Sequence, residues 1–487
     1  MYNLKAKAYK GGRFFLACIG LFIVSSCVFR PNYTRPPVNV PENWRLPVHE
    51  ACGLANIYWW QQLGDPVLEA LIIEALKNNY TLQAAMASVE AYYSQFRATN
   101  SQLFPQITGD GSALRQGLSA QSNLGLAQNL RLINSFSALL SCAYELDIWG
   151  RLGSASDVAL AQYLGEIQAR RTVILTLVSA LANSYITLRQ YDEQLQVAQQ
   201  TLNSFQESLE LMTDQWEQGE SSELPITQAS AERDTAASLV KQLEVNVAQQ
   251  ENLLCILLGR NPGNIRRGKI LEELAQPPSI PAGLPSDVLE QRPDVMQAEL
   301  NLIAAHANVG VAKANLFPRI SLTGYYGNQS FALNTLFKGA ACAWQVGTTF
   351  SEQIFNGGLY IAQLDKAHAQ EKQALFSYYN TIQTAFKEVE NALISHSKSL
   401  EVLEIQKDQV QALQKSLALA SLAYDNGQVD YLNVLDAQRN LFSAQLNLVQ
   451  ARSATYTTFI GVYKALGGGW VQEADTLATE GQNCVYP

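Results

Sequence analysis

The longest regular pattern in the chain is a seam of apolar residues separated alternately by four and three positions. In the first half the seam consists of Leu177, Leu181, Ser184, Leu188, Tyr191, Leu195, Ala198, Leu202, Phe205, Leu209, Met212 and Trp216. The second half carries the same phase at Leu403, Val410, Leu413, Leu417, Ala420 and Tyr424. This spacing is typical of helices that pack as coiled coils. No proline lies between Pro105 and Pro225 or between Pro318 and Pro487, so very long helices are allowed.

Glycines predict where these helices begin and turn back. Four of them mark the expected ends: Gly153 and Gly358 before the long helices, and Gly219 and Gly427 after them. Glycine favours helix ends because it adopts the left-handed conformation found there. Return helices are then expected at residues 224–259 and 431–466, capped by Ser222 or Asp430. Each half therefore predicts a helical hairpin on the order of 100 Å long, at 1.5 Å per residue.

Shorter segments between the helices alternate apolar and polar residues. They cover residues 140–148, 320–326 and 344–350. Such alternation gives a strand one apolar and one polar face, and strands of about ten residues with aromatic residues near their ends suit a transmembrane β-barrel. An ordinary soluble sheet with one dry face would show the same pattern. Two hairpins, at about 105–149 and 318–355, cannot enclose a channel, so several copies must contribute unless the strands form no barrel.

The chain consists of one sequence unit that occurs twice. The segment Asn100–Pro105 returns as Ala314–Pro318 at an offset of 213, and further on the offset is 208. At the second offset Trp216, Gly219, Leu224, Ile226, Ala229, Leu258 and Gly259 align with Tyr424, Gly427, Leu432, Val434, Ala437, Leu466 and Gly467. We expect the loss of five residues to lie in loops after Pro105 and Pro318. A repeat of this size suggests pseudo-symmetry within one architecture.

The N-terminus has the layout of a secretory signal peptide. Basic residues at positions 5, 7, 10 and 13 precede an apolar run, Phe14–Val24, that is too short to span a membrane. The run ends in Val-Ser-Ser-Cys, which resembles a bacterial lipobox with Cys27 as the acylated residue. An ordinary signal peptide followed by an incidental cysteine is the alternative. Acyl chains anchor a protein by burying CH₂ groups at about 0.8 kcal/mol each. The residue after Cys27 is Val28 and not an aspartate, which favours sorting to the outer membrane.

The expected organisation follows from these segments. It comprises a signal peptide (1–26), a lipidated extended segment (27–65), a first repeat (66–274), a linker (275–285), a second repeat (286–470) and a C-terminal tail (471–487).

Composition excludes several classes of function. The formal charge is −9, and residues 1–26 carry four positive charges, so the mature chain has −9 − 4 = −13; an acidic chain does not suit phosphate backbones. The cysteines and the four histidines form no metal-binding or triad motif, which predicts no enzyme and no cofactor. Cys52 and Cys484 both lie in terminal segments, so a disulfide between them is one alternative and two free thiols are the other. The uncharged run 172–188 contains polar residues and is expected to be a buried helix, because it falls short of about 20 apolar residues.

An ordered set of motifs resembles a known family. The motifs are Pro31–Pro36, Trp59–Trp60, Asp65–Leu68, Tyr144–Arg151, Leu284–Ser286, Arg292–Asp294, Ile354–Gly358, Val434–Arg439 and Tyr463–Trp470. Together they resemble the TolC-like outer-membrane factors, and among them the NodT-type lipoproteins of RND efflux systems. The resemblance covers nearly the whole mature chain.

The resemblance implies a mainly α-helical protein with a small transmembrane β part. Three copies would form an α-barrel of long helices and a shared 12-stranded β-barrel, with four strands from each chain. Terminal segments and the linker would form a belt around the helices. The duct would carry drugs or other small solutes from an inner-membrane pump through a periplasmic adaptor. Two alternatives remain: the same duct serving type I protein secretion, and a lipid-anchored coiled-coil protein that spaces the envelope.

The resemblance also implies a gate at the hairpin tips. Carboxylates near the second glycine narrow the periplasmic mouth in the family, and three copies of an acid around an axis would attract cations. Asp430 and Asp436 are the candidates here, with Tyr424 as a bonding partner, while Val429 and Asn433 depart from the family pattern. The alternatives are a helix cap for Asp430 and a solvated or capping residue for Asp436. The tips at Gly219 and Gly427 would contact the adaptor.

Overall fold

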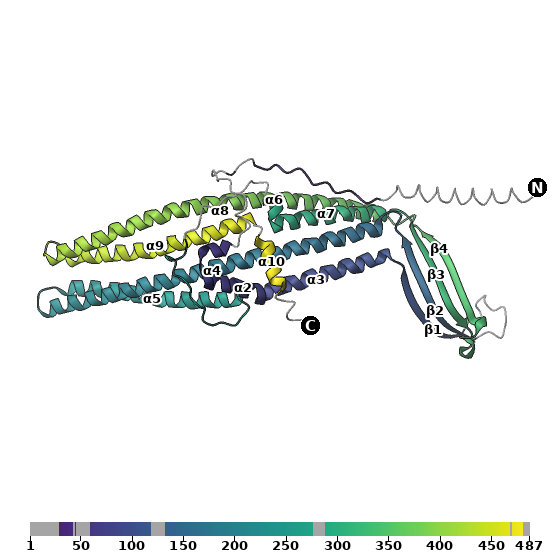
Figure 1. Cartoon of the computed structure of the whole chain (residues 1–487), viewed down its shortest axis with the longest axis horizontal. Helices are drawn as coiled ribbons and strands as arrows, with labels where there is room; N and C mark the ends of the chain where they lie inside the picture. Colours follow the sequence, from purple (N-terminus) through teal and green to yellow (C-terminus); the bar gives the residue numbers. More distant parts are fainter. Residues whose placement is uncertain are drawn as a thin grey trace, which may run out of the picture. The chain divides into compact units, whose positions relative to one another are not determined.

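The computed structural model describes residues 29–41, 44, 59–117, 132–275, 288–467 and 470–480. The predicted signal peptide, Cys27, Cys52 and Cys484 lie outside these residues, as does nearly all of the predicted linker. The elements, labelled as in Figure 1, are η2 (Trp59–Leu63), α2 (Pro66–Asn78), α3 (Tyr80–Asn100), η3 (Ser101–Leu103), β1 (Gln106–Gly117), β2 (Leu132–Leu146), α4 (Arg151–Glu217), α5 (Glu223–Leu257), α6 (Val288–Gln291), α7 (Pro293–Ala314), β3 (Arg319–Ser330), η4 (Leu333–Thr335), η5 (Gly339–Ala341), β4 (Cys342–Ser351), α8 (Leu359–Asp425), α9 (Tyr431–Leu466) and α10 (Trp470–Glu480).

The chain divides into two compact units. The sheet unit takes in the described residues of Met1–Pro37, Val89–Glu166 and Ala298–Tyr378, and it contains all four strands. The helical unit takes in those of Val38–Ser88, Ile167–Gln297 and Tyr379–Pro487, and it contains the two hairpin tips. Both units therefore draw on both sequence repeats.

The two long helices are present. α4 and α8 have 67 residues each, about 100 Å at 1.5 Å per residue, and the return helices α5 and α9 follow close to their expected positions. α4 starts at Arg151, before the predicted Gly153, because Asp147 caps it. The Asp147 carboxylate accepts hydrogen bonds from the backbone N–H groups of Leu152 (3.0 Å) and Gly153 (2.7 Å), so Gly153 lies in the first turn.

The uncharged run 172–188 is a core segment of α4, as predicted. An 18-residue window of α4 has a mean hydropathy of 1.3, enough to cross a membrane by composition and length alone, and 61% of that window is buried. Ile174, Leu181 and Tyr185 have no exposed surface. They pack with Trp59 in the main core of the helical unit.

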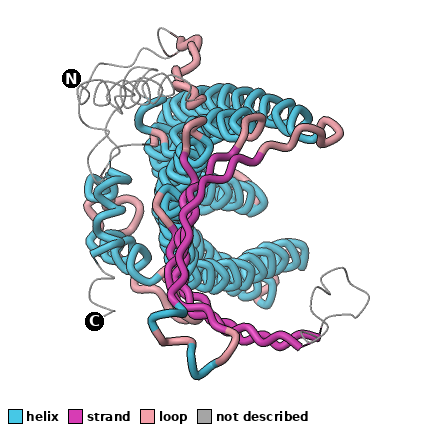
Figure 2. The backbone as a smooth tube through the Cα atoms, turned by 90° about the vertical axis from the view of Figure 1, so that its right-hand side faces the viewer, coloured by secondary structure: helices cyan, strands magenta, loops and turns pink. Residues whose placement is uncertain are grey.

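The four strands form one antiparallel sheet in the order β1-β2-β3-β4, drawn as a single layer in Figure 2. Leu140, Tyr326 and Trp344 lie opposite one another and are more than half exposed. The next row, which points to the other face, contains Ser141 and Gln345. The predicted apolar and polar faces are therefore present, and the sheet is open, with β1 and β4 as its edges.

The repeat is visible in the bounds of the elements. β3 starts and ends 213 residues after β1, while α8 starts and ends 208 residues after α4. Gln106 lies opposite Ala143, and its equivalent Arg319 lies opposite Ser351, so β2 and β4 are already related by 208. The change of offset by five residues therefore falls between β1 and β2 in the first repeat and between β3 and β4 in the second, which is after Pro105 and Pro318 as predicted.

Candidate gate at the tips of the helical hairpins

Both predicted tips turn at their glycines. Gly219 has φ of 77° and Gly427 has φ of 70°, the left-handed conformation that glycine adopts without strain. Each turn is closed by the same backbone bond: Glu220 N donates to Gln215 O (2.8 Å), and Gln428 N donates to Ala423 O (2.9 Å). Both turns are therefore Schellman caps. Both glycines are exposed, which suits the predicted contact with an adaptor.

Asp430 lies at the N-cap of α9, but its side chain does not cap the helix. Its backbone is extended (φ −72°, ψ 155°), and the carboxylate makes no cap hydrogen bond. Ser222 occupies the same place before α5 and behaves in the same way. Instead the Asp430 carbonyl oxygen accepts a bond from Asn433 N (3.0 Å). Asp430 therefore lies at the N-cap position as predicted, but its side chain does not cap the helix. The carboxylate is exposed to solvent.

Asp436 belongs to an ionic link between the two return helices. Its carboxylate lies 2.6 Å from Arg439 Nη2, and Arg439 Nη1 lies 3.6 Å from Glu232 Oε1 of α5. The side chains of Asp436 and Arg439 are about half exposed, so the link contributes at most about 1 kcal/mol. Asp436 is therefore neither free nor a cap, and its charge is partly compensated by Arg439.

Tyr424 joins the two hairpins directly. Its hydroxyl donates a hydrogen bond to Gln215 Oε1 of α4 (3.0 Å), and its ring packs edge-on against Tyr431 at 5.6 Å between centroids. Tyr431 is buried in a cluster with Phe205 and Met212, and burial raises the pKa of its phenol, so the hydroxyl stays protonated at neutral pH. Tyr424 therefore bonds to Gln215 in this structure, and its part in a gate stays a prediction.

Sequence reasoning missed Gln215, Glu232 and Arg439. No described hydrogen bond or ion pair joins Asp430 to Asp436 or to Tyr424. Tyr424 and Asp436 therefore belong to two separate links, and Asp430 belongs to neither. One signal could have identified Gln215: it precedes Trp216, which is the repeat equivalent of Tyr424.

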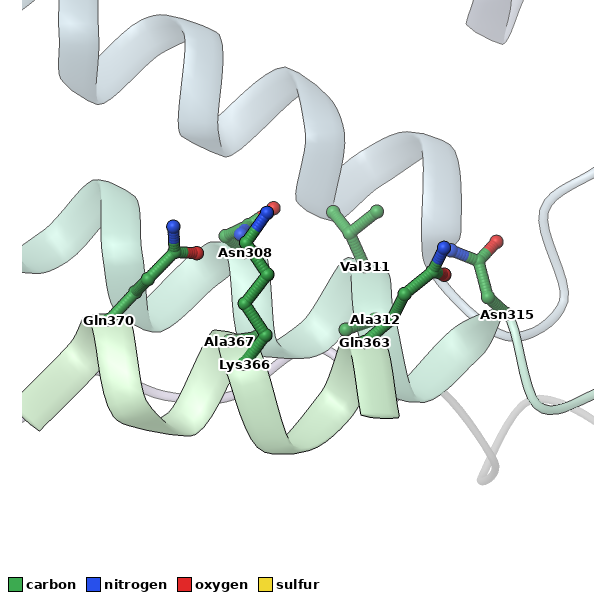
Figure 3. A pocket seen from close by; sticks show the side chains of 8 residues that line it. All are labelled: Asn308, Val311, Ala312, Asn315, Gln363, Lys366, Ala367 and Gln370. Carbon is green, nitrogen blue, oxygen red and sulfur yellow. The ribbon is translucent and has the colours of Figure 1, made fainter. Parts of the chain in front are cut away.

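Other polar sites lie in the sheet unit. A groove of about 220 Å³ between α7 and α8 is lined by four side-chain amides and Lys366, together with Val311 and two alanines (Figure 3). A second cavity, of about 330 Å³, contains His306, whose Nδ1 lies 2.5 Å from Glu371 Oε1. Among the described residues no group of three His, Cys, Asp or Glu side chains could hold a metal ion. Cys142, Cys255 and Cys342 are free thiols.

Known proteins resemble the chain over most of its length. The model of the family "Outer membrane efflux protein" matches residues 71–260 and 284–468, once for each repeat. The toluene efflux pump outer membrane protein TtgC of Pseudomonas putida is 37% identical, with 93% of this chain and 94% of the relative covered. The probable outer membrane lipoprotein SilC of Salmonella typhimurium is 32% identical, with 93% and 98% covered.

A solved structure agrees with the sequence relatives. The cation efflux system protein CusC of Escherichia coli is 34% identical, with 93% of this chain and 98% of CusC covered. A crystal structure of CusC, described as forming a transmembrane channel, superposes with a TM-score of 0.82 at 34% identity, and covers 91% of this chain and all of that one.

These likenesses confirm several predictions. The fold class is that of an outer-membrane channel, mainly helical with four strands in each chain. Its location in the outer membrane is confirmed, as is its role in efflux. The chain belongs to the outer membrane efflux protein family, the TolC-like factors.

Proposed function

We propose that the chain is a passive exit duct for drugs and other small solutes, which an RND-type pump delivers through a periplasmic adaptor. The observation that carries this proposal is the open four-stranded sheet with one apolar face, joined in the same chain to two long helical hairpins. Three such sheets supply enough strands to enclose a channel. The names of TtgC and CusC supply the solute class, because they refer to the efflux of toluene and of cations.

The proposal also accounts for the exposed apolar side chains of the sheet. Trp344 is 71% exposed, Val346 is 81% exposed and Phe350 is 70% exposed, and all three point to one face of β4. In a barrel this face would contact lipid while the polar face would line water. A coiled-coil protein that only spaces the envelope would leave these side chains in water.

Planar-bilayer conductance of the purified mature protein, with the oligomeric mass measured on the same sample, tests the proposal. We expect small cation-selective channels from a trimer. A monomer that forms no channel would instead support the envelope spacer. Export of a polypeptide, without any loss of drug tolerance when the chain is deleted, would favour protein secretion.

We also propose that Cys27 carries acyl chains. The first described residue, Phe29, stacks on Phe317 with 4.6 Å between centroids, and its N–H donates to Trp149 O (3.1 Å). Trp149 and Phe317 lie where β2 ends and β3 begins, and aromatic residues of this kind gather at membrane surfaces. An acyl group two residues before Phe29 would thus be close to the lipid.

Lipidation predicts a specific labelling result. Cells grown with a clickable palmitate analogue should label the wild-type chain and not Cys27→Ser. The variant Cys18→Ser is the matched control, because that cysteine lies inside the apolar run, and it should keep its label. Equal labelling of Cys27→Ser and the wild type would exclude the lipobox assignment.

We propose that the hydrogen bond between Tyr424 and Gln215 helps to hold the gate closed. Tyr424→Phe removes only the hydroxyl that donates to Gln215 Oε1, a neutral hydrogen bond worth about 1 kcal/mol. The channel should therefore be open more often, by about five-fold for each bond that must break before it opens. Gln215→Ala should have the same effect, and the double variant should add little, because both changes break one bond. Fully additive effects would show that the two side chains act separately.

A further inference from the structure

The groove between α7 and α8 carries a positive charge. Lys366 lines it together with four side-chain amides, which are those of Asn308, Asn315, Gln363 and Gln370. Among the residues that the structure describes, no ion pair involves Lys366, and none of the side chains that line the groove is a carboxylate. An ammonium group has three donors and no acceptor, and each amide adds two N–H donors. The groove therefore suits a ligand that is negatively charged and accepts hydrogen bonds.

The N-terminal segment marks one face of α7. We call residues 29–37 the N-terminal strap. The Tyr33 ring packs edge-on against His306 with 6.0 Å between centroids, and Lys313 Nζ lies 4.7 Å from the centre of the Phe29 ring. The proposed acyl anchor lies just before the strap, so we take the strap side of α7 as the outer side of the duct.

The groove opens on the opposite face of α7. Asn308 follows His306 by two residues, and Asn315 follows Lys313 by two residues, which turns each amide by about 200° from a strap contact. Figure 3 shows Asn308 and Lys366 extending to the same side of the two helices. The amides and the lysine therefore face away from the strap, toward the inner side of the duct.

The first repeat shows which of these side chains the helix pair itself requires. Three of the four amides recur at the equivalent positions of the first repeat, at offsets of 213 and 208. These are Gln95 for Asn308, Gln102 for Asn315 and Gln162 for Gln370. The charge does not recur, because Lys366 corresponds to Val158. A lysine that only one repeat carries is not needed for the packing of the helices.

We propose that the groove between α7 and α8 is a binding site on the inner wall of the duct for solutes that carry a carboxylate, with Lys366 as its anchor. The ammonium group pairs with the carboxylate, and the neighbouring amides donate to acceptors of the same solute. The inference rests on the exit duct proposed above and names one class of solute that the duct serves.

The size of the groove sets how it holds a solute. Its volume of about 220 Å³ is smaller than the roughly 300–1,000 Å³ of pockets that enclose a drug-sized ligand. The groove therefore takes the charged end of a solute while the rest stays in the duct. Binding of this kind is weak, so it does not stop the solute from leaving.

Ligand-observed NMR on the full mature protein in detergent tests the site. The probe is benzoate, and benzamide is the comparison, because it has nearly the same shape without the charge. Lys366→Gln should weaken benzoate binding about ten-fold, since it removes a charge-assisted hydrogen bond, whereas Lys366→Arg should keep it. Benzamide should bind the wild type as weakly as benzoate binds Lys366→Gln. Lys387→Gln is the matched control and should bind benzoate normally. Lys387 is an exposed lysine 21 residues further along α8, about 30 Å from Lys366.

The first repeat allows a test by gain of binding. Val158→Lys in the Lys366→Gln background places a lysine beside the equivalent amides and should restore benzoate binding. No restoration would overturn the role of the amides. Equal binding of benzoate by the wild type and Lys366→Gln, or equal binding of benzoate and benzamide by the wild type, would overturn the carboxylate site.

Bilayer conductance of the same sample separates the site from the duct. A conducting trimer without lysine-dependent benzoate binding would overturn the site and leave the duct. Lysine-dependent binding by a protein that does not conduct would overturn the duct, and with it the place of the site on an inner wall.

Discussion

Gly259→Ala is expected to destabilise the protein far more than Gly219→Ala, although both glycines end a helix in the same conformation. Gly259 has φ of 73° and Gly219 has φ of 77°. A left-handed backbone costs a residue with a Cβ roughly 1–2 kcal/mol, and this part is equal at both sites. The difference is in the surroundings. A Cβ at Gly259 would lie 2.2 Å from the backbone oxygen of Asn78, whereas at Gly219 it would meet nothing within 4 Å.

The close approach at Gly259 follows from how the return helix ends. Asn79 Nδ2 donates to the carbonyl oxygen of Leu257 (2.9 Å), which holds the end of α5 against the start of α3. A backbone atom cannot move aside as a flexible side chain can. Overpacking of this kind costs roughly 1–3 kcal/mol more, so we expect roughly 2–5 kcal/mol at Gly259 and roughly 1–2 kcal/mol at Gly219.

The second repeat supplies an independent pair of variants. Gly467 has φ of 72°, and a Cβ there would lie 2.5 Å from Arg292 Cγ, while Gly427 has φ of 70° and open space around it. Arg292 Nη1 donates to Ala465 O (2.9 Å), in the role that Asn79 has in the first repeat. Gly467→Ala should therefore be the more damaging substitution of this pair.

Thermal unfolding of the four alanine variants, followed by far-UV circular dichroism, measures these differences. The expected order is a large fall in the transition temperature for Gly259→Ala and Gly467→Ala, and a small fall for Gly219→Ala and Gly427→Ala. Equal falls in transition temperature at all four sites would mean that the left-handed conformation alone determines the loss of stability. The neighbouring backbone would then have moved aside at Gly259 and Gly467.

The parts of the fold that were predictable are those set by local sequence. The heptad seams and the absence of proline fixed two helices of 67 residues, and Gly219 and Gly427 marked both tips because only glycine adopts positive φ there without strain. Alternation predicted which residues share a face of the sheet. The predicted start of α4 was wrong by two residues because Asp147 caps the helix from the preceding segment, a contact that neither the heptad seam nor the glycines indicate.

The contacts between elements were not predictable in the same way. Gln215 meets Tyr424, and Glu232 meets Arg439, only after each hairpin has packed beside the other. In the repeat, Gln215 corresponds to Ala423 and Arg439 to Ala231, so each link exists in one direction only. These links therefore lie at positions where one repeat has a polar residue and the other has alanine. Once the two repeats are aligned, such positions indicate where contacts between the hairpins occur.

The second large effect is expected on ion selectivity. Asp430→Ala with Asp436→Ala removes two carboxylates from each chain and six from the proposed trimer, all near the tips. The exposed Asp430 side chain makes no cap bond, so its charge acts on passing ions directly, while Arg439 partly offsets that of Asp436. Acids arranged around a pore attract cations. The double variant should lose most of its preference for cations, conduct more current, and be blocked less by divalent cations.

Single substitutions separate the two carboxylates. Asp430→Ala alone should account for most of the change, because Asp436→Ala removes one charge and leaves Arg439 facing Glu232. Arg439→Ala should act in the opposite direction and raise cation selectivity, since it uncovers Asp436 and Glu232. Asp408→Ala is the control: this exposed acid lies 17 residues before the end of α8, about 25 Å along the helix and beyond the Debye length of about 10 Å in 0.1 M salt. Reversal potentials across a salt gradient measure the four single variants and the double variant, and selectivity that is unchanged in the double variant would remove both aspartates from the gate.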